Sequence, residues 1–456
     1  MRVLLVQPPV EDFYITSQRL QPTGLLYLAS FLRRQGHEVE ILDLLYPLKR
    51  TRIPLDDELA YLEGIFKSRR IPDLFRRYCR FGALPDAAAR LIGSRTFDVC
   101  GVSANFSAYY RTSLEICGMV RSIRPSAFVV VGGNSAPVCF RTYLESGSVD
   151  AVVFGEGEKT MLDLLSCRSK GERMESVPNI AFLRDGVVRE TPRAGNFDIE
   201  SSSLDLDFVD PDHYRIGRRR VLSMVTSRGC PARCGYCTAN LNCLSGHQRR
   251  SLDSAWNEVG RNVEKHGIEA LNIEDENFTV DRDYSLEFLE RKAEIFPGLR
   301  LFFMNGLDYR TLDDGLLAGL RKADLLNLGL ALVDAENTDL INRPASVEKF
   351  RSVVSRAKEL GFRVTAYFIA GLPGQTRESL DRLVALLSGL GVVVGMSPYY
   401  AVPGTDIFER GKARFEGLKF GQMRSTALIS ATDGVTPGDM LDLLDKVRGL
   451  NLGLRV

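Results

Sequence analysis

The chain of 456 residues is 45% apolar and 26% charged, a composition typical of an ordinary globular protein with about two to three domains. This composition excludes fibrous proteins, disordered proteins and small domains held together by disulfides. The 59 basic and 58 acidic residues leave a net charge of +1, so neither nucleic acid nor an anionic membrane is an expected partner. No apolar run approaches the ~20 residues of a membrane-spanning helix and no secretory signal is evident, so we expect a cytoplasmic protein.

Strand-like and helix-like segments alternate over the first part of the chain. The strands that we expect are residues 3–7, 39–43, 98–103, 128–131 and 149–154. Because these runs are apolar on both faces and helix-like segments such as 24–34 separate them, the sequence predicts an α/β domain with a parallel, doubly wound, Rossmann-like sheet over residues 1–186. The charged segment of about 47–95 is expected to be a helical insertion in this domain.

A polar segment rich in Ser, Asp and Arg, residues 187–215, is expected to be a linker. A second alternation of strands and helices follows it, with strands expected at 221–226, 270–274, 301–304, 325–331, 363–369 and 392–396. Six β-α repeats are too few to close an eight-stranded barrel. The sequence therefore predicts a partial (β/α)6 barrel of the TIM type over residues 216–405, followed by a short helical C-terminal tail over 406–456.

Nine cysteines are an odd number for a chain of this length and do not describe a disulfide framework. Three of them, Cys230, Cys234 and Cys237, follow the first expected barrel strand, at the end where such barrels do chemistry. Three thiolates on this Gly- and Pro-containing loop can hold one [4Fe–4S] cluster, and since such a cluster normally takes four Cys ligands, one iron would stay open for an exogenous ligand. Four others lie among apolar neighbours and are expected to be small buried hydrophobes: Cys79, Cys100, Cys117 and Cys139.

Two other kinds of site could use these cysteines in place of an iron–sulfur cluster. A structural zinc site would need Cys243 or His247 as its fourth ligand, but the second Cys-x-x-Cys pair that zinc ribbons use is missing. A thioredoxin-like redox pair of Cys234 and Cys237 would leave Cys230 unexplained. The iron–sulfur cluster is therefore the preferred interpretation.

The spacing C-x-x-x-C-x-x-C, with Tyr236 before the last cysteine, resembles the defining motif of the radical S-adenosylmethionine (SAM) superfamily. The segments 272–279 and 371–376 are similar to the second-strand and fifth-strand segments of that family. The resemblance implies that Cys230, Cys234 and Cys237 bind a [4Fe–4S] cluster whose open iron chelates SAM. It also implies an electron donor such as flavodoxin or ferredoxin, and cleavage of SAM to a 5′-deoxyadenosyl radical; the cofactor carries the hard chemistry and the protein positions it.

The same resemblance assigns SAM contacts to residues on three segments. Tyr236 would lie near the adenine, the acids that end the second barrel strand would hold the ammonium group, and the backbone of 369–372 would contact the adenine, with glycine at 371 allowing close approach. The alternative is that these three acids bind no ligand, because acids at a strand end are often only solvated. The residues assigned to SAM in this way are Tyr236, Glu274, Asp275, Glu276, Ile369 and Gly371.

One stretch departs from the family pattern. Relatives usually have Gly-x-Glu-Ser at the end of the fourth barrel strand, whereas here the corresponding residues are 329–334, in which Ala331 and Leu332 cannot make those hydrogen bonds. Either Asp334, Glu336 or Asn305 substitutes for the missing pair, or SAM sits differently.

The segments 22–29, 36–37, 101–103, 130–133 and 154–158 together resemble the cobalamin-binding domain that precedes many radical SAM enzymes. Many cobalamin domains ligate cobalt through Asp-x-His-x-x-Gly after the first strand, and no histidine lies between Val3 and Gly36 here. Many radical relatives also lack that ligand; a degenerate domain kept as scaffold is the alternative. The resemblance places the corrin or its nucleotide tail against Ser103, Ser107, Gly132, Gly133, Glu156 and Gly157.

The resemblance makes a cobalamin-dependent C-methyltransferase the leading functional hypothesis, acting on an unactivated carbon of an unknown small molecule. Radical ring closure, oxidation or carbon–carbon coupling without methyl transfer is the second hypothesis, and a non-catalytic iron–sulfur binding or assembly protein is the third. An apolar barrel mouth that would suit a hydrophobic substrate is expected from five residues, although aromatic residues at strand ends are usually ordinary packing: Phe368, Tyr399, Tyr400, Leu330 and Leu332.

Overall fold

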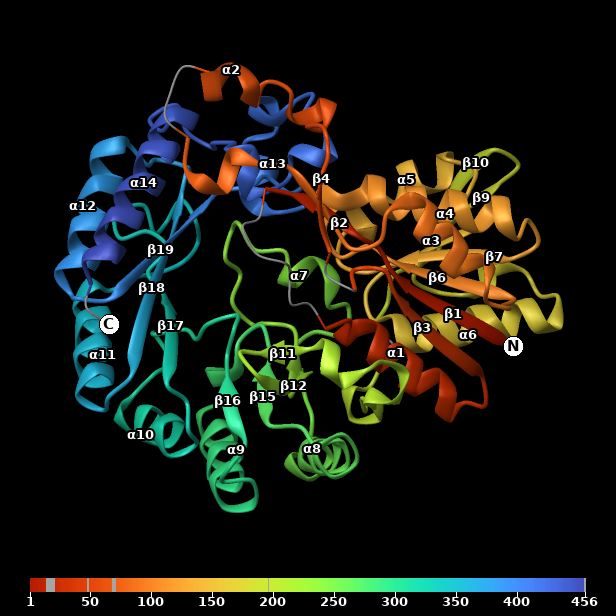
Figure 1. Ribbon diagram of the computed structural model, residues 1–456, viewed down its shortest axis with the longest axis horizontal. Helices are drawn as coiled ribbons and strands as arrows, with labels where there is room; N and C mark the ends of the chain where they lie inside the picture. Colours follow the sequence, from red (N-terminus) through yellow and green to blue (C-terminus); the bar gives the residue numbers. More distant parts are fainter. Residues whose placement is uncertain (14–20, 47–48, 68–70, 196, 455–456) are drawn as a thin grey trace.

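The computed structural model describes residues 1–13, 21–46, 49–67, 71–195 and 197–454. Two α/β lobes lie side by side, with the N-terminus at the outer end of one lobe and the C-terminus at the outer end of the other (Figure 1). Residues up to β10 (Val187–Glu190) build the first lobe and residues from β12 (Arg219–Met224) to β19 (Val393–Pro398) build the second. Among the described helices, none is long and apolar enough to cross a membrane.

A seven-stranded sheet forms the centre of the N-terminal lobe, in the order β10-β9-β8-β7-β6-β1-β3. Helices α1 (Thr23–Arg34) and α6 (Gly157–Lys170) cover one face, and α3 (Pro85–Gly93), α4 (Tyr110–Ile123) and α5 (Ala136–Glu145) cover the other. This arrangement confirms the predicted doubly wound sheet. Its five parallel strands are β1 (Arg2–Gln7), β3 (Glu38–Asp43), β6 (Val99–Ser103), β7 (Phe128–Gly132) and β8 (Ala151–Val153).

Two segments of the N-terminal lobe differ from the prediction. Residues 187–190 belong to the sheet as β10, which forms a hairpin with β9 (Ile180–Arg184), so the expected linker begins inside the lobe. The turn Asp185-Gly186 has positive φ at both positions, as a tight hairpin turn requires. The expected helical insertion also holds two strands, which form a small antiparallel sheet with β2 (Val10–Asp12): β4 (Arg50–Arg52) and β5 (Cys79–Phe81).

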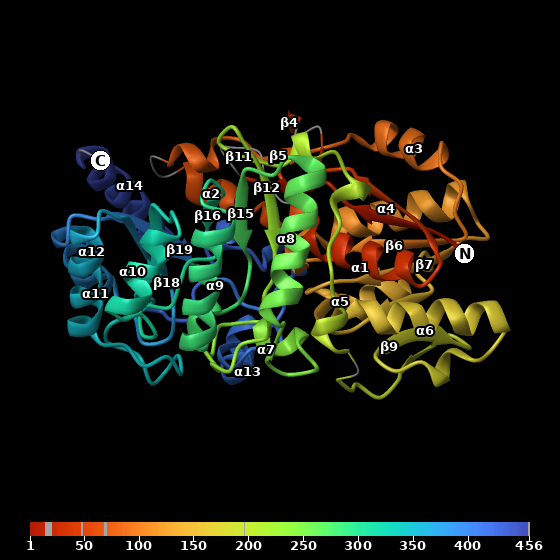
Figure 2. The same ribbon diagram turned by 90° about the horizontal axis from the view of Figure 1, so that it is seen from below.

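Six parallel strands surround the interior of the second lobe and confirm the predicted partial barrel. They form two hydrogen-bonded groups, and the parallel bridges Leu301 to Leu325 and Leu307 to Leu330 join these groups. The remaining strands are β15 (Ala270–Ile273), β16 (Arg300–Phe302), β17 (Asn327–Ala331) and β18 (Arg363–Ala370). The helices around them are α8 (Leu252–His266), α9 (Arg282–Ile295), α10 (Asp314–Lys322), α11 (Val347–Glu359) and α12 (Arg377–Gly389) (Figure 2).

The strand period of two decides which side chains face the barrel interior. Phe368, Leu330 and Leu332 are buried in the layer between strands and helices, and Tyr399 is buried against Phe415. The expected apolar barrel mouth is therefore wrong for these four residues, while Tyr400 stays exposed. The residues predicted from β17 and β18 lie on the outward face of these strands, because a shift of one residue along a strand exchanges the two faces.

One amide side chain pairs with each outer edge of the partial barrel, and on the β12 edge it continues the pairing made by β11 (Arg215–Ile216). On β12, the Gln21 side chain accepts from the Ser223 N–H at 2.7 Å and donates to the Val221 carbonyl at 3.3 Å. On β19, Asn451 of α14 (Pro437–Gly453) accepts from the Val394 N–H at 2.9 Å and donates to its carbonyl at 2.8 Å. Both amides therefore pair with the strand edge as a neighbouring peptide would.

The C-terminal tail reaches both lobes. Helix α14 packs beside α12 and β19 (Figure 1). The segment before it returns to the N-terminal lobe, where the buried Arg424 donates to the carbonyls of Ala108 and Glu11 at 2.6 and 2.7 Å. Thr426 donates to the buried Asp12 carboxylate at 2.6 Å. The tail therefore ties the barrel to β2 and to the short helix Ser107–Tyr109 of the N-terminal lobe.

Candidate functional site

The three clustered cysteines lie in the loop between β13 (Ser227–Arg228) and α7 (Ala239–Asn242), and all three are half-buried. The loop is held by backbone contacts: the Gly235 N–H donates to the Ile341 carbonyl at 2.8 Å, and the Gly235 carbonyl accepts from the Ile407 N–H at 2.9 Å. The three thiols lie close enough to one another to interact electrostatically. Burial raises the pKa of the Cys230 and Cys237 thiols, so bound metal is the natural means of making them thiolates.

The three cysteine sulfurs are not gathered as closely as the ligands of one zinc ion would be. A zinc ion with Zn–S bonds of about 2.3 Å gathers its ligands within roughly 4 Å of one another. In the described part of the chain, the three cysteine sulfurs are not within 4.8 Å of one another. The two candidates for a fourth zinc ligand have other partners, since Cys243 donates to the Gly246 carbonyl at 2.8 Å and His247 Nδ1 lies 3.0 Å from the Gly229 carbonyl.

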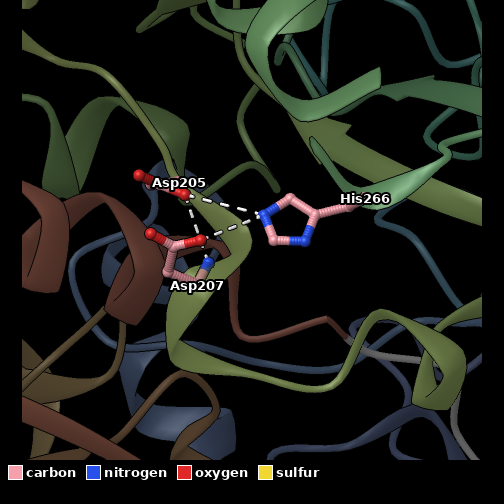
Figure 3. Close-up of side chains that lie close together, drawn as sticks. All are labelled: Asp205, Asp207 and His266. Carbon is pink, nitrogen blue, oxygen red and sulfur yellow. Dashed lines mark hydrogen bonds and ion pairs between the residues drawn. The ribbon is translucent and has the colours of Figure 1, made fainter. Parts of the chain in front are cut away.

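One group of side chains is compact enough for a single ion: Asp205, Asp207 and His266, whose ligand atoms lie within 4.8 Å of one another (Figure 3). Cations of the protein already balance these carboxylates. Arg33 lies 2.6 Å from Asp205, and Lys265 lies 2.5 Å from Asp207. The group is therefore an ion-pair network that joins α1 to α8, and it needs no metal.

A positive charge lies beside the cysteine loop. The guanidinium of Arg343 donates to the Cys234 sulfur at 3.4 Å, and its other nitrogen lies 3.6 Å from the Asp308 carboxylate. Tyr236, the residue expected near the adenine, is half-buried in the same group of side chains, and burial raises the pKa of its hydroxyl. The Arg343 guanidinium therefore places a hydrogen-bond donor and a positive charge against the middle cysteine of the motif.

The three acids after β15 have different surroundings. Asp275 is buried and accepts hydrogen bonds from the Thr226 N–H and hydroxyl, both at 2.6 Å, and from the Ser227 hydroxyl at 2.7 Å. Its carboxylate therefore shapes the start of the cysteine loop and is not available for an ammonium group. Spacing alone did not reveal this role of the Asp275 carboxylate, and a contact of the Asp275 backbone carbonyl with the ammonium group stays a prediction.

Glu274 and Glu276 remain available for a cation. Glu274 is half-buried beside Asn272, whose amide donates to it at 3.1 Å, and burial raises the pKa of its carboxyl. Glu276 is exposed, and its carboxylate lies close enough to Cys230 and Cys237 to interact with them electrostatically. An acid next to the cluster ligands suits a bound ammonium group.

The turn after β18 is already hydrogen-bonded within the protein. The Gln375 side chain accepts from the Gly371 N–H at 2.8 Å and the Leu372 N–H at 2.9 Å, and it donates to the Ile369 carbonyl at 3.0 Å. A Cβ at Gly371 would lie 2.5 Å from Met440, and φ there is +97°. The turn and the tail therefore already require glycine at position 371, and its contact with the adenine stays a prediction.

The three residues that could replace the missing Glu-Ser pair also have different surroundings. Asp334 is buried and accepts from the backbone of Glu336 and from Gln375 at 2.9 Å. The Glu336 carboxylate forms a two-point ion pair with Arg382 at the surface. Asn305 is exposed and donates to the Glu274 carbonyl at 3.1 Å, so it alone among the three lies beside a predicted SAM contact.

Residues assigned to the corrin lie along one edge of the N-terminal sheet. Ser103 and Gly132 end β6 and β7, Gly157 begins α6 after β8, and Ser107 begins the short helix that follows β6. The carboxyl ends of parallel strands share one edge, and this edge points toward the second lobe (Figure 1). Gly133 has φ +119°, and a Cβ there would lie 2.9 Å from the Ala104 carbonyl, so the turn itself requires this glycine.

Two acids at the start of α6 contact the segments on either side of the cysteine loop. Glu156 accepts from the Ser245 N–H at 3.1 Å and lies 3.5 Å from the Cys243 sulfur. Glu158 forms a buried ion pair with Arg228 at 2.6 Å, two residues before Cys230. The N-terminal lobe therefore holds the cysteine loop from both sides. Glu156 was expected to contact the corrin, but one of its oxygens binds the other lobe instead.

Gly132 gives a direct measure of where the corrin docks. A Cβ at Gly132 meets only Val153 at 3.7 Å, and its φ is not positive, so Gly132→Leu should fold while filling space at the sheet edge. We expect this variant to bind hydroxocobalamin at least about 10-fold more weakly than the wild type by equilibrium dialysis. Gly186→Ala, in the distant hairpin turn, is the matched control, and equal affinity of Gly132→Leu and wild type would contradict the docking.

Several residues that support the site were not predicted. Three of them, Arg228, Glu158 and Arg343, act through contacts with residues far away in the chain, and no short-range spacing reveals such pairs. Gln375 acts instead within its own turn. The one available signal was position: Arg228 lies two residues before the first cysteine of the motif.

Comparison with protein families matches two parts of the chain. The family described as the radical SAM superfamily matches residues 224–387, and the family described as the B12 binding domain matches residues 75–165. The first match begins on β12 and includes the cysteine loop. A radical SAM domain implies a [4Fe–4S] cluster and SAM, and a B12-binding domain implies cobalamin.

Two curated proteins and one solved structure place these domains in context. Cytidylyl-2-hydroxyethylphosphonate methyltransferase of Streptomyces wedmorensis is 26% identical over 423 residues, which cover 84% of this chain and 76% of that protein. Anaerobic magnesium-protoporphyrin IX monomethyl ester cyclase of Rubrivivax gelatinosus is 25% identical over 402 residues, covering 84% of this chain and 71% of the other. The structure of the radical SAM methyltransferase TsrM from Kitasatospora setae superposes with a TM-score of 0.70 at 17% identity, covering 98% of this chain and 88% of that one, and this likeness concerns the fold. The chain therefore carries a radical SAM domain over residues 224–387, which a B12-binding domain over residues 75–165 precedes.

Proposed function

We propose that this cobalamin-dependent radical SAM enzyme transfers a methyl group to an unactivated carbon of a small molecule. The observation that carries the proposal is the contact between the two lobes: the sheet edge predicted to face the corrin also holds the cysteine loop, through Glu158 to Arg228 and Glu156 to Ser245. When bound, the cluster with SAM supplies a 5′-deoxyadenosyl radical that removes a hydrogen atom, and methylated cobalamin supplies the methyl group. The relationship to a phosphonate methyltransferase supports the same reaction.

The side chains divide the work around this reaction. Cys230, Cys234 and Cys237 would ligate the cluster, which an electron donor such as flavodoxin or ferredoxin would reduce. Glu276 and Glu274 would hold the ammonium group of SAM, since both carboxylates lie at the carboxyl end of β15 and one of them neighbours the thiols. In this proposal Asp275 only positions the loop.

Ring closure is the second candidate, because the chain is also similar to a cyclase over 402 residues. Both reactions begin with removal of a hydrogen atom and so form 5′-deoxyadenosine. They differ in the second product, because methyl transfer regenerates methylcobalamin from another SAM and releases S-adenosylhomocysteine. A non-catalytic iron–sulfur protein would form neither product.

The test uses the full chain, purified without oxygen and loaded with cluster and cobalamin. With dithionite, SAM and a small-molecule extract, we expect 5′-deoxyadenosine and S-adenosylhomocysteine to accumulate together, as measured by mass spectrometry. Cys234→Ala should remove the iron–sulfur absorbance near ~400 nm and both products, whereas Cys139→Ala, a buried thiol of the other lobe, should retain them. 5′-Deoxyadenosine without S-adenosylhomocysteine would favour ring closure. The absence of both products would refute the proposal that this protein is a radical SAM enzyme.

A further inference from the structure

The inward face of β18 carries an aromatic ring that the fold leaves uncovered. Val364, Ala366 and Phe368 point outward and are buried beneath the helices. Tyr367 points to the other side, into the barrel, and is 45% exposed although its strand is paired on both edges. A large aromatic side chain at such a central position is ordinarily buried.

The ring lies flat across its neighbouring strands. A Cβ built on Gly395 of β19 would lie 2.4 and 2.5 Å from Cδ1 and Cε1 of the Tyr367 ring, and one built on Gly329 of β17 would lie 3.3 Å from Cε2. Opposite edges of the ring therefore rest on two glycines, one on each neighbouring strand. Only a hydrogen atom in place of a side chain leaves room for the ring at Gly395.

The side chains around the ring are short. The inward positions next along the two neighbouring strands are Ala331 on β17, paired with Tyr367, and Ser397 on β19, paired with Ile369. With glycine below each edge of the ring and small residues beyond, one face of Tyr367 stays open to the interior.

We propose that Tyr367 is the platform on which a planar aromatic or heteroaromatic group of the substrate stacks. An open ring face pairs best with another flat π-system in an offset stack. The inference rests on the proposed function, because it assigns the substrate of that same barrel. The adenine of SAM is a different ligand: it is expected at residues 369–372, and Tyr367 lies two residues deeper, about 7 Å along the strand.

The test measures binding to the full chain without turnover. The probes are 2-naphthol and decahydro-2-naphthol, two neutral alcohols with the same carbon skeleton of which only the first is planar and aromatic. We expect the wild type to bind 2-naphthol about 3- to 10-fold more tightly by calorimetry. Tyr367→Phe should retain this preference, and Tyr367→Leu should reduce it to less than twofold.

Two measurements keep the result specific to the substrate surface. Binding of S-adenosylhomocysteine should be the same in Tyr367→Leu and wild type, which also shows that the variant is folded. Gly395→Ala provides a second route, because its methyl group displaces the ring, and it should weaken the preference for 2-naphthol. A preference unchanged in Tyr367→Leu, no preference in the wild type, or a loss of S-adenosylhomocysteine binding in Tyr367→Leu would each overturn the proposal. Since no methyl transfer is needed, these outcomes are separate from those that test the proposed function.

Discussion

Replacing Glu258 with alanine is expected to lower the free energy of unfolding by about 3–5 kcal/mol, because it leaves the buried charge of Arg250 without its partner. Glu258 and Arg250 both have fully buried side chains, with a separation of 2.9 Å. Glu258 also accepts from the Tyr27 hydroxyl at 3.0 Å and from the Leu204 N–H at 2.8 Å. One carboxylate thus joins α1 of the N-terminal lobe, the segment between the lobes and α8 of the barrel.

The expected loss is measured by urea unfolding at equilibrium. Asp253→Ala is the matched control on the same helix, since Asp253 is exposed and pairs with Arg291 at the surface; this change should cost less than about 1 kcal/mol. A loss below 1 kcal/mol in Glu258→Ala would show that the buried ion pair does not hold the lobes together.

Replacing Glu158 with alanine should make the iron–sulfur cluster about 10- to 100-fold easier to remove, an effect typical of losing a residue that supports metal ligands. The change leaves Arg228 with its charge but without the carboxylate at 2.6 Å. Arg228 also lies over the rings of Tyr27 and Phe197, at 5.4 and 5.3 Å, so its side chain is held within the interface. Loss of its partner therefore disturbs the loop that carries Cys230.

Release of iron to a chelator under anaerobic conditions gives the measurement. Asp163→Ala, on the exposed side of the same helix α6, removes only the ion pair with Lys159 and should release iron at the wild-type rate. Addition of cobalamin should slow the release in the wild type if the two sites are coupled through Glu158, and the same coupling requires that the cluster strengthens cobalamin binding. Equal rates of iron release from Glu158→Ala and the wild type would show that Glu158 does not support the cluster.

Periodicity was sufficient to predict most of the fold. The predicted strand 363–369 corresponds to Arg363–Ala370 and the predicted helix 24–34 to Thr23–Arg34, because each segment buries one regularly spaced set of side chains. The hairpin of β9 and β10 was missed although Asp185-Gly186 is a typical turn pair. Its strands are short and the outer one is largely exposed, so hydrophobic alternation is weak there.

The site was predictable only where chemistry depends on local spacing. The three cysteines fall in one loop because they are close in sequence, and parallel strands bring the corrin-facing residues to one edge. The use of Asp275, Glu156 and Gly371 depended instead on contacts with Thr226, Ser245 and Met440. Choosing Phe368 over Tyr367 was an error of a single position, which on a strand reverses inside and outside.

The amide caps on the two open barrel edges bear on solubility. A barrel with six strands exposes two rows of unpaired peptide groups, and such edges invite pairing with a strand of another chain. Gln21 pairs with one edge and Asn451 with the other. Asn451 follows Val394, whose peptide group it caps, by 57 residues, so during synthesis the edge of β19 stays open to strand pairing until α14 has been made and has folded.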